Sequence, residues 1–239
     1  MITLEMPEPP MQDLVLTPKQ EDFRSNAARP EAREVLRHRI SIGGPVYRRI
    51  TADSTDDAEL QRFLRGEGAD SDFYMLHLTC TLRPGEEEPF TEALIELDLT
   101  SEGDRGLPIA WSMLPDRLVD AVEISRTVSL TPTLKIAGAG VAVNAERTSA
   151  ATKQEVLLEA MYELESTPSW GLYRTSSVEL RGLYRFHLVV RAPKNSTVAG
   201  TTLAEAKVRR RRFGIVPYSA RLPQSAQHHQ AFTLTGHLA

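Results

Sequence analysis

The chain of 239 residues is 41% hydrophobic and 25% charged, which is enough to bury a core without disulfides or metal. No apolar run approaches the roughly 18 residues that cross a bilayer as a helix, so the composition excludes a helical membrane protein, and it also excludes a wholly disordered chain. One cysteine excludes an intramolecular disulfide and a cysteine-based metal centre.

The formal net charge is −4, but basic and acidic residues are distributed unevenly along the chain. Residues 1–170 carry 17 basic and 30 acidic side chains, whereas residues 171–239 carry 11 basic and 2 acidic side chains. Such a chain either pairs its basic end with the acidic part inside the fold or presents a positive face to an anionic partner. The start of the sequence lacks the basic and then apolar pattern of a secretory signal, so we expect a cytoplasmic protein.

The N-terminal segment, residues 1–36, is expected to be an extended arm with short helices. Prolines break any long element within residues 1–18. Helix starts follow at residues 17–20 and 29–36, because each places a proline at the first helical position. A small helix is predicted near residues 54–66, where acidic residues precede an apolar stripe that glycines end.

From residue 74 the hydrophobic period changes from helical to two. Residues 74–82 and 95–99 alternate apolar and polar side chains, which predicts two strands. The segment between them contains proline, glycine and glutamate, and it predicts a turn that pairs the strands as a hairpin. Cys80 lies on the apolar face, where a core position is favoured over a nucleophile because burial raises the pKa of a thiol.

The middle of the chain has weaker patterns. Residues 111–120 predict a loop and a short helical turn. Strands are predicted over residues 122–130 and 134–145, and the second contains Gly138 and Gly140 at the spacing of part of a phosphate loop. The third glycine and the acidic residue of a dinucleotide site are missing, so a bulge or a close strand contact is the favoured interpretation.

Residues 153–165 fit two structures, a helix with a capping box and an apolar stripe, or a strand with alternating side chains. Residues 178–191 alternate without a break and predict the clearest strand of the chain. If the two segments form an antiparallel hairpin, one register places Glu159 opposite Arg181 and another places Glu163 there. Such pairs contribute about 0.2 to 1 kcal/mol each, so the strand is favoured and the register stays open.

The last predicted element, residues 203–215, contains four consecutive arginines. In a strand they point to both faces, so part of the run must lie at a sheet edge, a strand end or an interface. Residues 223–239 are polar and unpatterned and predict a tail. The elements together predict a mainly β protein, an antiparallel β-sandwich over residues 37–222, with short N-terminal helices and one small helical insertion near residues 54–66.

No motif for catalysis, cofactor binding or metal binding is present, and we expect none of these sites. His77 and His187 fall on the outer faces of predicted strands, where surface positions are favoured. His228 and His229 lie in the predicted tail without a further metal ligand at suitable spacing. We therefore expect a protein that is not an enzyme, and an enzyme with an unrecognised site is kept as an alternative.

Two clusters remain as candidate partner-binding residues. Trp170, Tyr173 and Arg174 lie at the predicted turn between the long strands; these residue types are enriched in interface hot spots, although they could equally plug one end of a sandwich. The arginine run could bind phosphates or lipid head groups, or pair with acidic residues of the chain. Nucleic acid is not expected, because the whole chain is acidic. The arginines of the run are Arg209, Arg210, Arg211 and Arg212.

The sequence therefore predicts a non-catalytic cytoplasmic interaction or assembly module that binds a protein partner or its own copies. The alternative is an anionic-membrane-associated or pore-forming component, because the outer face of the two long strands also carries apolar side chains. These side chains are Leu157, Met161, Leu183 and Val189.

Overall fold

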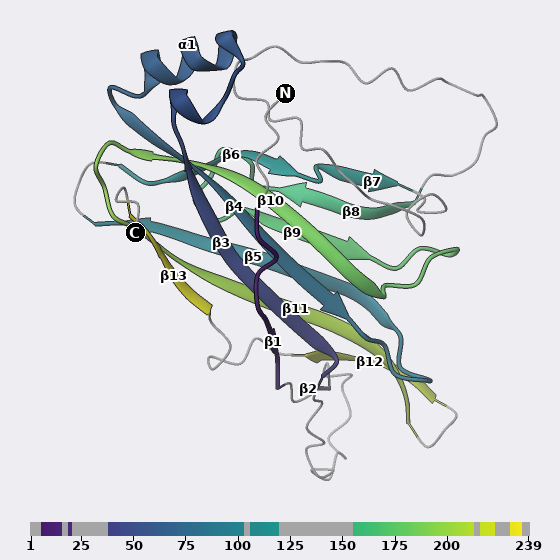
Figure 1. The fold of residues 1–239 in the computed structure, drawn as a ribbon. Helices are drawn as coiled ribbons and strands as arrows, with labels where there is room; N and C mark the ends of the chain where they lie inside the picture. Colours follow the sequence, from purple (N-terminus) through teal and green to yellow (C-terminus); the bar gives the residue numbers. More distant parts are fainter. Residues whose placement is uncertain are drawn as a thin grey trace, which may run out of the picture.

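The computed structural model describes residues 6–15, 19–20, 38–102, 106–119, 155–212, 216–222 and 230–235. These residues form two antiparallel β-sheets that pack face to face, with one short α-helix at one end (Figure 1). The antiparallel β-sandwich predicted from the sequence is confirmed.

Five strands form the first sheet. They are β1 (Met11–Asp13), β3 (Ile40–Ile50), β4 (Ser71–Leu82), β6 (Ile109–Leu114) and β10 (Gly182–Pro193). Their order across the sheet is β1-β3-β4-β10-β6. The central strands β4 and β10 pair along their whole lengths, with Leu78 opposite Phe186 and Cys80 opposite Tyr184.

Eight strands form the second sheet. They are β2 (Lys19–Gln20), β5 (Phe90–Ser101), β7 (Arg117–Val119), β8 (Val156–Met161), β9 (Ser169–Tyr173), β11 (Val198–Arg212), β12 (Val216–Leu222) and β13 (Gln230–Leu234). Seven of them follow the order β2-β12-β11-β5-β9-β8-β7, and β13 pairs with the start of β11. The long strand β11 thus has β5 on one side and both β12 and β13 on the other.

The main core lies between the two sheets. Trp170 of β9 and Phe186 of β10 meet there with ring centroids 4.8 Å apart, and both side chains are fully buried. The Trp170 Nε1–H donates a hydrogen bond to the Pro115 carbonyl oxygen at 3.1 Å, so the indole is satisfied inside the core. The alternation predicted for residues 178–191 is confirmed at Phe186, and Tyr184 packs partly buried against the same core.

The helix α1 (Ala58–Glu67) covers part of the outer face of the first sheet, after a 3-10 turn, η1 (Ala52–Ser54). An aspartate caps its N-terminus by accepting two backbone hydrogen bonds. Leu60 and Leu64 on its inner side join a second apolar cluster with the sheet. The sheet residues of this cluster are Ile50, Phe73, Met75 and Val189. The helical insertion predicted near residues 54–66 is confirmed.

The predicted hairpin between residues 74–82 and 95–99 is wrong. Both segments are strands, but β4 pairs with β3 and β10 in the first sheet, whereas β5 pairs with β9 and β11 in the second. The connection between them crosses from one sheet to the other. A connection rich in proline and glycine can form a hairpin within one sheet or cross to the other sheet. Both arrangements bury the apolar face of each strand, so the local sequence does not determine which sheet each strand joins.

Residues 153–165 contain a strand, β8, which confirms the favoured prediction. The predicted hairpin with residues 178–191 is wrong, because β8 lies in the second sheet and β10 in the first. Glu159 is opposite Arg117 of β7, not Arg181. Glu159 therefore does face an arginine, but this arginine belongs to β7 and not to residues 178–191.

Two segments that were predicted as irregular are short strands. Residues 111–120 contain part of β6 and all of β7, and Pro115, which suggested a loop, occupies the break between them. The segment around Trp170, predicted as a turn, is β9, which lies between β5 and β8. The backbone N–H and C=O groups of such short segments form hydrogen bonds with neighbouring strands. Those strands are distant in sequence, so a local pattern does not reveal them.

Both ends of the chain add strands. Residues 6–15 are extended as predicted, and within them β1 pairs with β3. Lys19 and Gln20, predicted to begin a helix, instead form β2 against β12, because capping residues also suit extended segments. Residues 230–234, predicted as tail, form β13, and Leu234 is fully buried. Outside the described residues lie the rest of the predicted N-terminal helices and the predicted strands at 122–130 and 134–145, with Gly138 and Gly140.

Candidate functional site on the outer face of the second sheet

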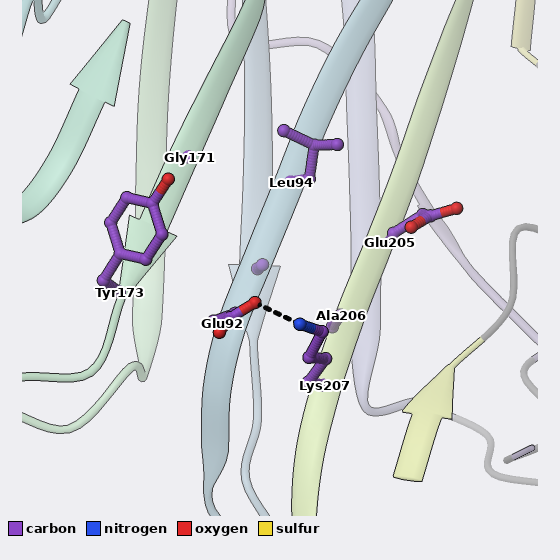
Figure 2. Close-up of a pocket in the computed structure, with 8 residues that line it drawn as sticks. Glu92, Leu94, Gly171, Tyr173, Glu205, Ala206 and Lys207 are labelled. Carbon is purple, nitrogen blue, oxygen red and sulfur yellow. Dashed lines mark ion pairs between the residues drawn. The ribbon is translucent and has the colours of Figure 1, made fainter. Parts of the chain in front are cut away.

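A groove of about 300 Å³ lies on the outer face of the second sheet, where β9, β5 and β11 run side by side (Figure 2). Tyr173 comes from β9, Leu94 from β5, and Glu205 from β11. The groove therefore combines an aromatic ring, an aliphatic side chain and a carboxylate on three neighbouring strands.

The alternation of β5 and β11 places these side chains outside the core. In β5, Ile95 and Leu97 are buried between the sheets, and the residues between them point the other way. In the register of the sheet, Glu92 is opposite Lys207 on one side and opposite Tyr173 on the other. Residues that are far apart in sequence thus share one face.

A glycine allows the Tyr173 ring to lie along the sheet. A Cβ at position 171 would lie 2.5 Å from the Tyr173 hydroxyl oxygen, which is closer than a real Cβ tolerates. Figure 2 shows the Tyr173 ring extending toward Gly171, its neighbour on the same face of β9. The ring is partly buried and forms one wall of the groove.

One end of the groove is basic. The Lys207 ammonium forms an ion pair with the Glu92 carboxylate at 2.8 Å (Figure 2). Arg209 is the next residue of β11 on the same face, and it is exposed. Arg174, directly after β9, does not line the groove; it is exposed and forms an ion pair with Glu179 at 3.3 Å. We call Lys207 and Arg209 the basic end.

The other side of the groove is acidic. Glu96 and Asp98 follow Leu94 on the outer face of β5, and Glu205 is opposite Leu94. Partial burial, and then repulsion from Glu205 and Asp98, raise the pKa of Glu96 above its ordinary value. We call Glu96, Asp98 and Glu205 the acidic half.

The structure brings together three of the seven predicted partner-binding residues. Tyr173 lines the groove. The Arg174 backbone N–H donates to the Thr91 carbonyl oxygen at 2.9 Å, and the Arg209 backbone N–H donates to the Pro89 carbonyl oxygen at 2.9 Å. The two arginines therefore lie on either side of the start of β5, although two different sequence features pointed to them.

The other four residues are placed differently. Trp170 is a core residue, which is the second of the two roles that the sequence allowed, and it is not accessible to a partner in this fold. Arg210, Arg211 and Arg212 pair with β12 beyond Val208, the last residue of β11 that pairs with β5. The arginine run therefore lies at a strand end, one of the predicted positions; the side chains of these three residues lie outside the described structure.

Sequence reasoning missed Glu92, Leu94, Glu205 and Lys207. The available signal was the alternation within β5 and β11, which marks these residues as outward-facing. That signal does not say which strands are neighbours, and the groove exists only because β5 lies between β9 and β11.

His77 and His187 lie on the outer face of the first sheet, as predicted, but the surface position predicted for His77 is wrong, and His187 is partly buried. His77 is 3% exposed, and its ring stacks on that of His187 with centroids 4.6 Å apart. Burial lowers the pKa of both histidines, that of His187 to about 4. Cys80 lies in the core as predicted, and burial raises its pKa to about 12. His228 and His229 lie outside the described residues.

The apolar residues that suggested a membrane-facing surface do not form one. Leu157 and Val189 are buried in the two apolar clusters, and Met161 is partly buried. Leu183 is 45% exposed. The alternation that placed them on one face assumed a hairpin of β8 and β10, which the structure does not contain.

Among the described residues, no group of three or more His, Cys, Asp or Glu side chains is placed to hold a metal ion. Within the same residues, none of the helices has both the length and the apolar character of a membrane span. No family model and no curated protein matches the chain. Among solved structures, the chain is similar to the crystal structure of the Clostridium perfringens NetB toxin in the membrane inserted form, with a TM-score of 0.31 and 8% identity, over 95% of this chain and 97% of that chain. A TM-score this low does not establish a shared fold.

Proposed function

We propose that the chain is a non-catalytic assembly module that binds a second copy of itself through the outer face of the second sheet. One observation carries the proposal: the acidic half and the basic end lie toward opposite ends of a groove that is also lined by Leu94 and Tyr173. Separated charges around an apolar centre are typical of specific protein interfaces.

The charge layout is complementary to itself after a half-turn. A twofold axis near Lys207 places Glu205 of one copy opposite Arg209 of the other, because these residues lie two positions to either side of Lys207 on β11. Tyr173 is level with Lys207 in the register, because both are opposite Glu92, so the same operation brings the two Tyr173 rings toward the centre of the interface. Tyrosine and arginine are among the residue types that contribute most to such interfaces.

The crowding of the acidic half also supports a cationic partner. The raised pKa of Glu96 means that its charged form is disfavoured, first by partial burial and then by its carboxylate neighbours Glu205 and Asp98. A cation from a second copy would favour the charged form and lower this pKa. Linkage then requires association to weaken as the pH falls and Glu96 takes up a proton.

Sedimentation velocity over a range of protein concentrations tests the proposal. We expect the wild-type chain to form a dimer that dissociates as added salt screens the charges. Glu205→Lys and Arg209→Glu should each shift the chain toward monomer, because each places like charges opposite one another. The double variant should recover the dimer, because it exchanges the two charges.

Arg62→Glu on the exposed side of α1 is the matched control, and it should leave the dimer unchanged. A wild-type chain that remains monomeric at every concentration would overturn the proposal. So would a double variant that is weaker than both single variants, because that result contradicts a direct pairing of the two positions.

A second candidate function is binding to a membrane surface, and one observation favours it. Leu107, Tyr162 and Leu164 are 64%, 56% and 58% exposed, on two neighbouring loops at one end of the sandwich. Tyr162 and Leu164 also have positive φ values of 62° and 69°. Such conformations cost about 1 to 3 kcal/mol each for residues other than glycine, and they concentrate at functional sites.

Vesicle co-sedimentation tests this second candidate. Glu163 and Glu165 flank the exposed side chains, so vesicles of phosphatidylcholine should bind better than vesicles that also contain phosphatidylserine. The variant with both Tyr162→Ser and Leu164→Ser should lose binding, and Leu183→Ser, an exposed leucine elsewhere, should keep it. Absence of wild-type binding to either kind of vesicle would contradict a membrane role.

A further inference from the structure

The histidine pair, His77 of β4 and His187 of β10, lies on the outer face of the first sheet. The two residues are opposite each other in the register, and their rings are stacked with an interplanar angle of 9°. The Nδ1 atom of His77 lies 3.2 Å from the Pro7 carbonyl oxygen, and because a carbonyl only accepts, Nδ1 donates this hydrogen bond. The His77 Nε2 is then an acceptor; it is buried, and it has no hydrogen-bond partner among the described residues.

Residues 6–10 cross the sheet at the histidine pair, and we call this segment the strap. Its Pro7 carbonyl accepts the hydrogen bond from the pair, and the Glu8 carboxylate forms an ion pair with Arg185 at 2.7 Å. Pro9 is buried, and Met6 packs against the apolar cluster beneath α1. The strap continues into β1, which runs along β3 (Figure 1).

Protonation changes the balance of these contacts. A proton on the His77 Nε2 creates a buried N–H with no acceptor among the described residues, and two protonated rings would hold like charges 4.6 Å apart. The charged groups that act on the pair are Glu8 of the strap and Arg185 of β10. Val46 of β3 is opposite one histidine and Leu114 of β6 is opposite the other, so the neighbouring strands supply no anion there.

We propose that the unprotonated histidine pair holds residues 6–10 on the sheet, and that protonation of the pair releases this segment while β1 stays paired with β3. The anchor of β1 is independent of the pair. The Asp13 carboxylate binds Ser41 and His38, and it lies 3.6 Å from a guanidinium nitrogen of Arg83. The hydrogen bond from Ser41, and then that from His38, lower the pKa of Asp13, so this carboxylate stays charged in mild acid.

The direction of the pH dependence follows from burial. Burial lowers the pKa of His77, and it lowers that of His187 from its ordinary value of about 6.5 to about 4. The Pro7 hydrogen bond and the Glu8 charge act to raise the pKa of His77, but burial outweighs them. With the strap in place the pair therefore binds fewer protons than it would in water, so acid favours the released state. The strap should stay bound above about pH 6.5 and leave the sheet as the pH falls toward about 4. Release uncovers the pair and the edge of the cluster beneath α1.

Site-directed spin labelling tests the proposal on the full chain. Cys80, the single cysteine, is buried, so a nitroxide reagent labels an introduced cysteine. Pro10→Cys places the label in the strap and Gln12→Cys places it in β1, and both positions are exposed. Between about pH 7.5 and about pH 4.5 the label at position 10 should gain mobility, while the label at position 12 and the far-UV circular dichroism stay constant.

His187→Phe keeps an aromatic ring in the stack but cannot be protonated, so it should move the midpoint of release down by about one pH unit or more. Arg117→Gln changes an exposed residue of β7 in the second sheet and is the control that should leave this midpoint in place. The proposal is overturned if the label at position 10 stays ordered throughout, or if His187→Phe leaves the midpoint unchanged. It is also overturned if both labels gain mobility at the same pH at which the far-UV circular dichroism signal is lost, because that result indicates general unfolding in acid.

Discussion

Replacement of Trp170 by phenylalanine is expected to destabilise the sandwich, because Trp170 joins the two sheets. The variant leaves the Pro115 carbonyl without its donor, which costs about 1 to 3 kcal/mol in a buried site. The smaller ring also gives up on the order of 50 Å² of buried apolar surface, or about 1 kcal/mol. Trp170→Phe should therefore lower the free energy of unfolding by about 2 to 4 kcal/mol.

Urea denaturation followed by far-UV circular dichroism measures this change, and thermal unfolding should show a decrease of about 5 to 15 °C in Tm for a chain of this size. Trp111→Phe is the matched control: Trp111 is partly exposed on the outer face of the first sheet, and its loss should cost less. A Trp170→Phe variant within about 0.5 kcal/mol of the wild type would refute the conclusion that this side chain is satisfied and packed between the sheets.

The remaining predictions address four other features. Cys80 should not react with a thiol reagent at neutral pH in the folded chain and should react in denaturant, because burial raises its pKa to about 12. Leu234→Ala should lower the free energy of unfolding by about 2 to 5 kcal/mol in urea titrations, since Leu234 is fully buried; an unchanged midpoint would contradict the packing of β13. Burial holds the pKa of His187 at about 4, so the unfolded chain binds more protons than the folded one between about pH 4 and pH 6.5. The free energy of unfolding should therefore decrease as the pH is lowered through that window, and His187→Phe should make this decrease smaller. Gly171→Ala should displace the Tyr173 ring and weaken self-association in sedimentation velocity with little change in Tm; equal association would show that the ring position does not matter.

Much of the local structure was readable in the sequence. The alternation in β4, β5 and β10 identifies strands with one buried face, because side chains of a strand point alternately to opposite faces. The apolar stripe before two glycines identifies α1 in the same way through the helical period. These patterns are local properties of the chain, so they do not depend on which segments become neighbours.

The assignment of strands to sheets came only from the tertiary structure. β4 and β5 bury their apolar faces equally well as a hairpin or in opposite sheets, and the same is true of β8 and β10. Strand β9 was hidden because its five residues contain a glycine and follow a proline, which suggested a turn. Its place between β5 and β8 depends on hydrogen bonds to strands far away in the sequence.

The candidate site, too, was only partly predictable from the sequence. Residue type alone pointed to Tyr173, Arg174 and Arg209, because these side chains suit interfaces. The positions of these residues around the start of β5, the Glu92–Lys207 ion pair and the stacked histidines follow from register, which sets which side chains meet across strands. Each strand carries its own amphipathic pattern, whereas its partner and register are chosen by the packing of the whole sandwich, and a local pattern contains no information about that choice.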